Sequence, residues 1–200
     1  MKPIYEPKGK AKEYGDCAIN IYTGCPHECF YCFAPSVLRK VKDDFHRCVE
    51  PRKNIVEEVR RQIEREGITG KLVHLCFTCD PYPVGYDTTP TREIIKALKE
   101  NGNNVQILTK GDGRRDFDLL DENDWYGITL DGAECKAPKR ERLESLSLAK
   151  YKGIKTWVSF EPVTNVEKFF YGLHYVSTFI DKVKIFVKAG NGGNGVVSFH

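Results

Sequence analysis

The sequence has no long apolar run and almost no imbalance of charge. No stretch approaches the roughly 18 consecutive apolar residues of a membrane span, so we expect no transmembrane helix. The first residues lack the apolar core of a secretory signal peptide, which predicts a cytoplasmic protein. With 31 basic and 28 acidic residues, the net charge of +3 is too small to predict a nucleic-acid-binding surface by itself.

Cysteine is the residue that the sequence has in excess. The chain of 200 residues, 40% of them hydrophobic, fits one compact domain with a real core, and it carries eight cysteines. A reducing cytoplasm disfavours disulfides, so these cysteines favour metal or redox chemistry. Lone thiols such as Cys48 and Cys135 are expected to be buried and inert.

Short apolar runs alternate with longer amphipathic segments along most of the chain. Because each return between parallel strands must cross one face of the sheet, this alternation predicts an α/β fold. It is typical of a partial (β/α)6 TIM-like barrel, open on one side, or of a doubly wound sheet; we predict the barrel, and a closed one would need about 250 residues. The expected strands are Cys17–Tyr22, Lys71–Phe77, Asn104–Thr109, Trp125–Leu130, Lys155–Phe160 and Val183–Lys188, and the expected helices are Asn54–Glu66, Thr91–Glu100, Arg114–Asp121, Ala137–Tyr151 and Asn165–Phe179.

Three segments follow from this pattern. Residues 1–14, rich in lysine and proline, are predicted to form an extended arm, and residues 15–190 the (β/α)6 core. Residues 191–200 form a glycine-rich tail. Its glycines are interpreted as a flexible turn, or alternatively as a loop whose bare backbone approaches a ligand.

Three cysteines, Cys25, Cys29 and Cys32, follow the first predicted strand with the spacing C-x3-C-x2-C. Thiolates this close in sequence converge only if the loop wraps around a common centre, which indicates zinc or an iron–sulfur cluster. Structural zinc takes four ligands, and the only nearby candidate is His27, at an awkward spacing. A [4Fe–4S] cluster held by three cysteines leaves one iron open to a ligand, and we favour it.

These residues resemble a known family. The cysteine spacing, with Tyr31 before the last cysteine, is the signature of radical S-adenosylmethionine (radical SAM) enzymes. The stretches AINIYTGCPHECFYCFAP, CFTCDPYPVGYDTTPTREIIKAL and QILTKG, with residues 137–163, are similar to the spore photoproduct lyase-like branch, which is related to DNA repair photolyases. The resemblance implies a lyase-like enzyme whose cofactors are a [4Fe–4S] cluster on Cys25, Cys29 and Cys32 and S-adenosylmethionine. In that family, the cofactor is cleaved reductively to a 5′-deoxyadenosyl radical, which abstracts a hydrogen atom from the substrate.

The resemblance also implies cofactor-binding positions at the ends of the predicted strands. Thr78 and Asp80 would meet the amino group of the methionine part, although Thr78 also suits a plain strand and Asp80 a turn. Lys110 would pair with the cofactor carboxylate, and Thr129 with its ribose or carboxylate. The remaining candidates are Tyr31 and Glu161, and a structural hydrogen bond would explain Glu161 equally well.

Two further features lie on the second predicted strand. His74 alternates with Cys76 and Thr78 on one face, and the simplest interpretation is a core histidine with satisfied hydrogen bonds. Cys76 and Cys79 form a C-x-x-C pair. The lyase of the family uses a hydrogen-donating cysteine near this strand end, but neither cysteine can be matched to it, so the catalytic residues stay unassigned.

The leading prediction is therefore a radical SAM enzyme with an unidentified substrate, nucleic acid among the candidates. Two alternatives stay open: a zinc-stabilised binding module without catalysis, and a degenerate relative that keeps its cluster as an electron carrier. The expected partners are an electron donor such as flavodoxin or ferredoxin and a protein that completes the open barrel. We expect no association with a membrane.

Overall fold

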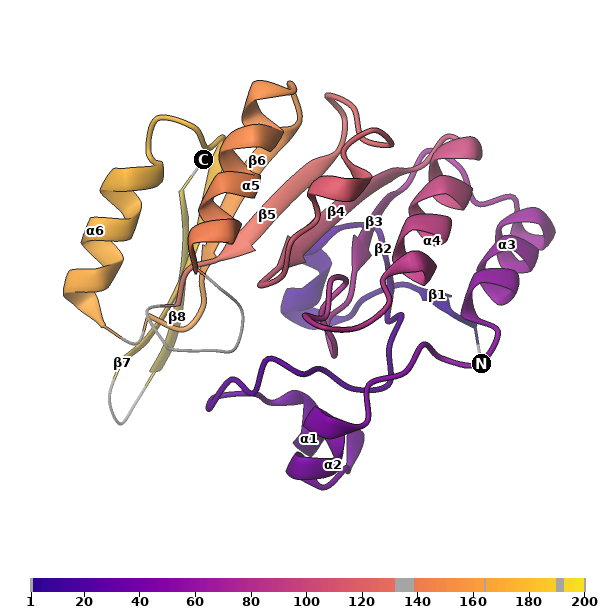
Figure 1. Cartoon of the computed structure of the whole chain (residues 1–200), viewed down its shortest axis with the longest axis horizontal. Coiled ribbons are helices and arrows are strands. Elements are labelled where there is room, and N and C mark those ends of the chain that lie inside the picture. The colour runs from indigo at the N-terminus through magenta and orange to yellow at the C-terminus, as the bar shows by residue number, and fades with distance from the viewer. Residues whose placement is uncertain (1, 132–138, 164, 190–192, 200) are drawn as a thin grey trace.

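The computed structural model describes residues 2–131, 139–163, 165–189 and 193–199, and within them eight strands form one sheet (Figure 1). The strands lie in the order of the sequence, and neighbours from β2 to β7 are parallel. Antiparallel strands β1 and β8 lie at the two edges. Their bounds are β1 Ile4–Tyr5, β2 Cys17–Ile19, β3 Leu72–Leu75, β4 Asn104–Thr109, β5 Trp125–Thr129, β6 Lys155–Phe160, β7 Lys182–Ala189 and β8 Gly193–Phe199.

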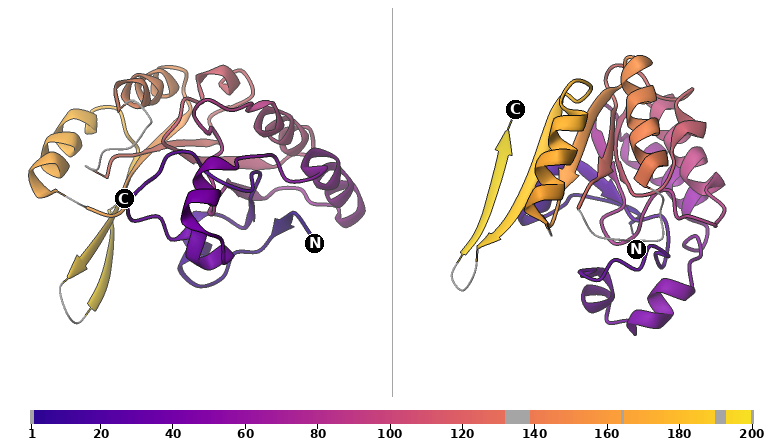
Figure 2. Two further views of the ribbon diagram at one scale, coloured as in Figure 1. Left: turned by 60° about the horizontal axis from the view of Figure 1, so that its bottom comes forward. Right: turned by 60° about the vertical axis from the view of Figure 1, so that its left-hand side comes forward.

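The order of the six parallel strands confirms the open (β/α)6 barrel. A doubly wound sheet reverses its strand order at a switch point and has helices on both faces. Here the order never reverses, and the helices line one face of a curved sheet (Figure 2). The two edge strands β1 and β8 do not pair, so the sheet stays open. The outer helices are α3 Ile55–Glu66, α4 Thr89–Glu100, α5 Lys139–Tyr151 and α6 Val166–Val176.

The predicted helix Arg114–Asp121 is wrong. Within the described residues this connection contains only a 3-10 turn, η2, Arg114–Asp116. Asp116 has a fully buried carboxylate, which pairs with Arg92 of α4 (3.1 Å) and with Arg115 (2.8 Å). Ion pairs thus hold the segment against α4, and it needs no helical apolar face.

Helix α3 shows how the sequence pattern becomes packing. Ile55, Val59 and Ile63 recur on one face and are buried. Asn54 precedes the helix in a left-handed conformation, and its side chain makes no cap hydrogen bond. Buried Gln62 of the same helix bonds to both backbone groups of Ile4 (2.9 and 2.8 Å), which holds β1 at the sheet edge.

The segments predicted as arm and tail both contain regular structure. Residues 1–14 carry β1 and the 3-10 helix η1, Gly9–Tyr14, which brings Tyr14 over the sheet. Gly193–Phe199 pairs with β7 as β8, whereas residues 190–192 and 200 of the glycine-rich stretch lie outside the described residues. Two short helices, α1 Ala34–Leu38 and α2 Lys42–Arg47, follow the cysteine loop.

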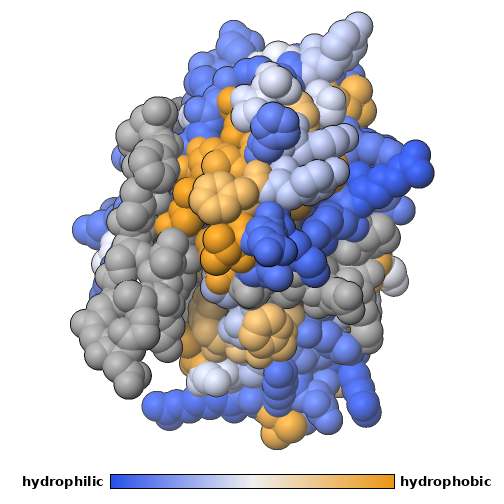
Figure 3. Space-filling model, turned by 90° about the vertical axis from the view of Figure 1, so that its left-hand side faces the viewer, coloured by the Kyte–Doolittle hydropathy of each residue, from blue (hydrophilic) through white to orange (hydrophobic). Residues whose placement is uncertain are grey.

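Exposed apolar side chains gather on helix α6. Figure 3 shows an apolar patch on this side of the molecule. The large hydrophobic side chains of α6 that are exposed are Val166, Phe170, Tyr171 and Tyr175. No helix in the described part of the chain is both long and apolar enough to cross a membrane.

Candidate functional site

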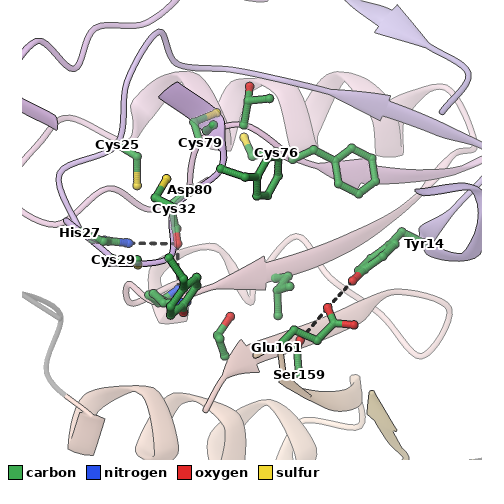
Figure 4. Close-up of a pocket in the computed structure, with 18 of the residues that line it drawn as sticks. Tyr14, Cys25, His27, Cys29, Cys32, Cys76, Cys79, Asp80, Ser159 and Glu161 are labelled. Carbon is green, nitrogen blue, oxygen red and sulfur yellow. Dashed lines mark hydrogen bonds and ion pairs between the residues drawn. The ribbon is translucent and has the colours of Figure 1, made fainter. Parts of the chain in front are cut away.

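A cavity of about 810 Å³ lies at the carboxyl ends of the parallel strands, where barrels of this kind carry their chemistry. Residues from the ends of β3, β4, β5 and β6 line it together with the cysteine loop. All nine site residues predicted from the sequence line it: Cys25, Cys29, Tyr31, Cys32, Thr78, Asp80, Lys110, Thr129 and Glu161 (Figure 4).

The cysteine loop leaves β2 and is held by backbone contacts with α2. The N–H of Cys25 donates to the carbonyl of Phe45 (3.2 Å), and the ring of His46 bonds to the carbonyl of Cys25 (2.7 Å). A side chain at Gly24 would lie 2.3 Å from the oxygen of Phe45, so only glycine permits this close approach. The loop thus presents its three thiols to the cavity.

The donor set fits an iron–sulfur cluster. None of the three thiols forms a disulfide, and burial raises the pKa of Cys25 and Cys32. No three His, Cys, Asp or Glu side chains in the described ranges converge closely enough to hold a single metal ion. A mononuclear zinc site needs such convergence, whereas a cluster distributes its cysteines over different irons. His27 is not available as a further ligand, because both of its ring nitrogens are engaged elsewhere.

Asp80 joins three parts of the cavity through its buried carboxylate. It accepts hydrogen bonds from the N–H of Lys110 (2.8 Å), the hydroxyl of Thr109 (2.5 Å) and the N–H of Tyr82 (2.8 Å). Nδ1 of His27 lies 3.3 Å from it, while Nε2 of His27 accepts from the N–H of Val84 (3.4 Å). We call Asp80, His27, Thr109 and Lys110 the anchor wall.

The pKa of Asp80 reflects these partners. Burial alone would raise it, but His27, Thr109 and the N–H of Lys110 outweigh burial, so the pKa is lowered. The carboxylate is thus charged and fully engaged with the protein. This geometry favours a structural role for Asp80, which connects the ends of β3 and β4 to the cysteine loop.

Two buried polar atoms of the cavity have no protein partner. They are Oγ1 of Thr78 and Nδ1 of His74. An unpaired buried polar atom costs about 1–3 kcal/mol, so its presence in a cavity indicates a site for a polar ligand. The interpretation of His74 as a satisfied core histidine is wrong: the ring is buried, but one nitrogen is unpaired, and burial lowers its pKa to about 3.

Lys110 and Tyr31 meet over Asp131. The Lys110 ammonium lies 3.2 Å from the Asp131 carboxylate and 5.4 Å from the centre of the Tyr31 ring. The Tyr31 hydroxyl donates to the same carboxylate, so Asp131 ties the cysteine loop to the strand ends. Burial, followed by Asp131, raises the pKa of Tyr31. Thr129, two residues before Asp131, is buried at the end of β5.

The opposite side of the cavity is built around Glu161. Its carboxylate accepts from the hydroxyls of Tyr14 (2.6 Å) and Ser159 (3.1 Å) and lies 4.0 Å from the Lys184 ammonium. The same ammonium is 3.4 Å from the centre of the Tyr14 ring and 3.3 Å from Glu13. We call Tyr14, Ser159, Glu161 and Lys184 the far wall.

Sequence reasoning missed the far-wall partners of Glu161. Ser159 could have been found, because it lies two residues before Glu161 on the same strand face. Lys184 carried a weaker signal, since it is a charged residue inside an apolar run. The sequence carries no signal for Tyr14, because only the tertiary fold brings the N-terminal segment to β6.

Expectations from the sequence also concern four further cysteines. Cys76 and Cys79 both line the cavity beside the cysteine loop. Cys48 is exposed, so the expectation of a buried thiol is wrong there. Cys135 lies outside the described residues.

Comparison with known proteins found one matching family model and several similar solved structures. The family model of the Radical SAM superfamily matches residues 19–164. No curated protein matches the chain.

The similar solved structures are spore photoproduct lyases. One, a mutant with bound AdoMet and dinucleoside spore photoproduct, aligns with a TM-score of 0.67 at 14% identity, over 88% of this chain and 55% of that chain. Another mutant aligns with a TM-score of 0.69 at 12% identity, over 92% of this chain and 59% of that one. At such identities the likeness establishes the shared fold. The present chain spans a little over half the length of these proteins.

Proposed function

Because this chain belongs to the radical SAM superfamily, we propose that it is an enzyme that binds a [4Fe–4S] cluster through Cys25, Cys29 and Cys32. The observation that carries this proposal is the position of the three cysteines, which form no disulfide and line one cavity at the carboxyl ends of the parallel strands. With S-adenosylmethionine bound beside it, the reduced cluster would supply a 5′-deoxyadenosyl radical for hydrogen abstraction from a substrate.

In this proposal, the cavity residues hold S-adenosylmethionine and exclude water from it. The unpaired hydroxyl of Thr78 is the best placed to bind the cofactor amino group, since it has no protein partner to lose. Lys110 would bind the cofactor carboxylate, as a cation beside the cysteine loop. Thr129 would meet the ribose or carboxylate. Asp80 would act through Lys110 and His27, as a positioning residue.

Tyr31 and Glu161 complete the proposed cofactor pocket from opposite sides. The Tyr31 ring would lie beside the cofactor, with its hydroxyl fixed by Asp131. Glu161 would orient a polar group of the cofactor from the far wall, where Tyr14 and Ser159 fix its carboxylate.

Several partners belong to the proposal. An electron donor of the flavodoxin or ferredoxin kind would reduce the cluster. None of the seven cysteines of the described residues forms a disulfide, which suits a reducing cytoplasm. A protein that completes the open barrel would cover the apolar face of α6. The substrate is unidentified; the similarity to spore photoproduct lyases makes nucleic acid one candidate.

The proposal is tested by anaerobic reconstitution with iron and sulfide. We expect about four irons and four sulfides per chain, and 5′-deoxyadenosine on addition of reductant and S-adenosylmethionine. A colourless protein with one zinc per chain would support the binding module instead. A full cluster that yields no 5′-deoxyadenosine would support the electron carrier.

Two serine variants provide a matched pair. Cys25→Ser removes a thiol of the cavity, and we expect it to lose most of its iron and all cofactor cleavage. Cys48→Ser alters an exposed thiol that does not line the cavity, and it should keep both. Equal iron content in the two variants would contradict the assignment.

A further inference from the structure

The turn after β3 holds two thiols that the proposed function does not use. Cys76 and Cys79 both line the cavity, and they lie three residues apart in one turn. Figure 4 shows them on the same side of the cavity as Cys25. Cysteines at C-x-x-C spacing are a common arrangement of redox-active thiol pairs.

The backbone of this turn is fixed in an unusual conformation. Cys76 has a φ of 70°, in the left-handed region that residues with a side chain seldom adopt. The N–H of Cys76 donates to the carbonyl of Ile19 (2.8 Å), and the N–H groups of Phe77 and Thr78 both donate to the Asn20 side chain (2.9 Å each). A strained residue held this firmly is a common mark of a functional turn.

The two sulfurs have different surroundings. Sγ of Cys79 accepts a hydrogen bond from the N–H of Tyr22 (3.4 Å), and the residue is only half-buried. Cys76 is buried, with 6% of its surface exposed. Burial raises the pKa of Cys76; for Cys79, burial is outweighed by the Cys76 thiol and by the backbone near Tyr22, so its pKa is lowered. Cys79, the more exposed residue, is thus the better nucleophile, and Cys76 lies three residues before it in the same turn.

We propose that Cys76 and Cys79 form a second redox site of the cavity, a dithiol that exchanges reversibly with low-molecular-weight disulfides. The Cys79 thiolate attacks one sulfur of glutathione disulfide, which forms a mixed disulfide and releases one glutathione. Cys76 then gives up its proton and attacks the Cys79 sulfur, which releases the second glutathione and leaves a Cys76–Cys79 disulfide. Two thiols are oxidised and one disulfide is reduced, so atoms and electrons balance. This chemistry goes beyond the proposed function and does not depend on the cluster.

The test is oxidation of the full chain by glutathione disulfide under anaerobic conditions, followed by alkylation and peptide mass mapping. We expect wild-type protein to lose two hydrogen atoms and to yield a peptide linked through Cys76 and Cys79, and excess reduced glutathione should restore both thiols. Cys76→Ser should accumulate a stable glutathione adduct on Cys79. Cys79→Ser should form no adduct on Cys76 at the same oxidant concentration, because Cys76 is buried. Cys48→Ser is the matched control and should behave as wild type.

The same experiment is repeated on a variant with serine at Cys25, Cys29 and Cys32. The thiol pair should react equally there, so failure of the cluster proposal and failure of this one are distinguishable. Full alkylation of both thiols after oxidation, a disulfide that joins Cys79 to the cysteine loop, or identical behaviour of Cys76→Ser and Cys79→Ser would each overturn the proposal. Circular dichroism of each variant separates loss of reactivity from loss of folding.

Discussion

The anchor wall and the far wall each centre on one carboxylate, but they hold it differently. Asp80 is bonded by two backbone N–H groups, and its side chain is only 9% exposed. Among the described residues, Glu161 accepts hydrogen bonds from the side chains of Tyr14 and Ser159 and lies 4.0 Å from the Lys184 ammonium, and its side chain is 22% exposed. Backbone donors cannot leave without unfolding the strand end, whereas side-chain donors can rotate. The anchor wall is therefore part of the fold, and the far wall can rearrange around a ligand.

The largest difference is expected when each carboxylate is replaced by an amide. Asp80→Asn replaces one carboxylate oxygen by an NH₂ group, which cannot accept a hydrogen bond. In this buried site the NH₂ group would face donors, among them the N–H of Lys110 and His27. We expect the free energy of unfolding to fall by about 3 kcal/mol. Glu161→Gln keeps an acceptor for Tyr14 and should cost about 1 kcal/mol.

Urea denaturation measures both variants. Asp118→Asn is a suitable control, since its carboxylate lies in an exposed ion pair with Arg92 and should change stability by less than about 1 kcal/mol. A Glu161→Gln variant as destabilised as Asp80→Asn would remove the distinction between the walls.

Two threonines allow a sharper version of the comparison. The hydroxyl of Thr109 bonds to Asp80, so Thr109→Val should destabilise the protein by about 2 kcal/mol. The hydroxyl of Thr78 is buried without a partner, so Thr78→Val should leave stability within about 0.5 kcal/mol of wild type. In the cluster-loaded protein, however, it should weaken S-adenosylmethionine binding about tenfold, or about 1.4 kcal/mol. Equilibrium binding and urea denaturation together check this; a Thr78→Val variant that binds normally would mean that this hydroxyl serves no ligand.

The smallest effect concerns pH and the buried ring of His74. Its pKa is about 3 in the folded protein and about 6.5 when unfolded, so between these values only the unfolded chain binds the proton. Protonation therefore favours unfolding, and stability falls as pH drops below 6.5. Between pH 7 and 5.5 we expect His74 to account for about 1 kcal/mol.

His74→Gln isolates this contribution from other titrating groups. The variant should lose about 1 kcal/mol less than wild type over the same interval, as measured by urea denaturation at both pH values. Parallel losses in the two proteins would show that the ring is not held neutral by burial.

The sequence was most informative where function depends on local spacing. The three cysteines are close in the chain, and the family resemblance implied Thr78, Asp80, Lys110, Thr129 and Glu161 at or near the ends of predicted strands, which must meet at one edge of the sheet. All eight line the cavity. The strands Asn104–Thr109 and Lys155–Phe160 were predicted to the residue.

The remainder depends on contacts between distant segments. The Tyr14–Glu161 hydrogen bond joins residues 147 positions apart, and no local pattern marks either as the other's partner. The failed helix at Arg114 has the same cause, since buried Asp116 pairs with Arg92 of another helix. The role of Asp80 could not be predicted from its turn motif either. Ligand binding and a structural role differ in which donors surround the carboxylate oxygens, and these donors come from other segments.

The unpaired edges of the sheet have a consequence for the size of what can react. In a closed barrel every molecule must enter through the mouth, so a long polymer can present only an end or an extruded unit. In the described structure β1 and β8 are not joined, so the ladder of backbone hydrogen bonds ends at each of them. In the proposed function, the protein that completes the barrel would therefore decide whether a long polymer reaches the cavity from the side or only by one end.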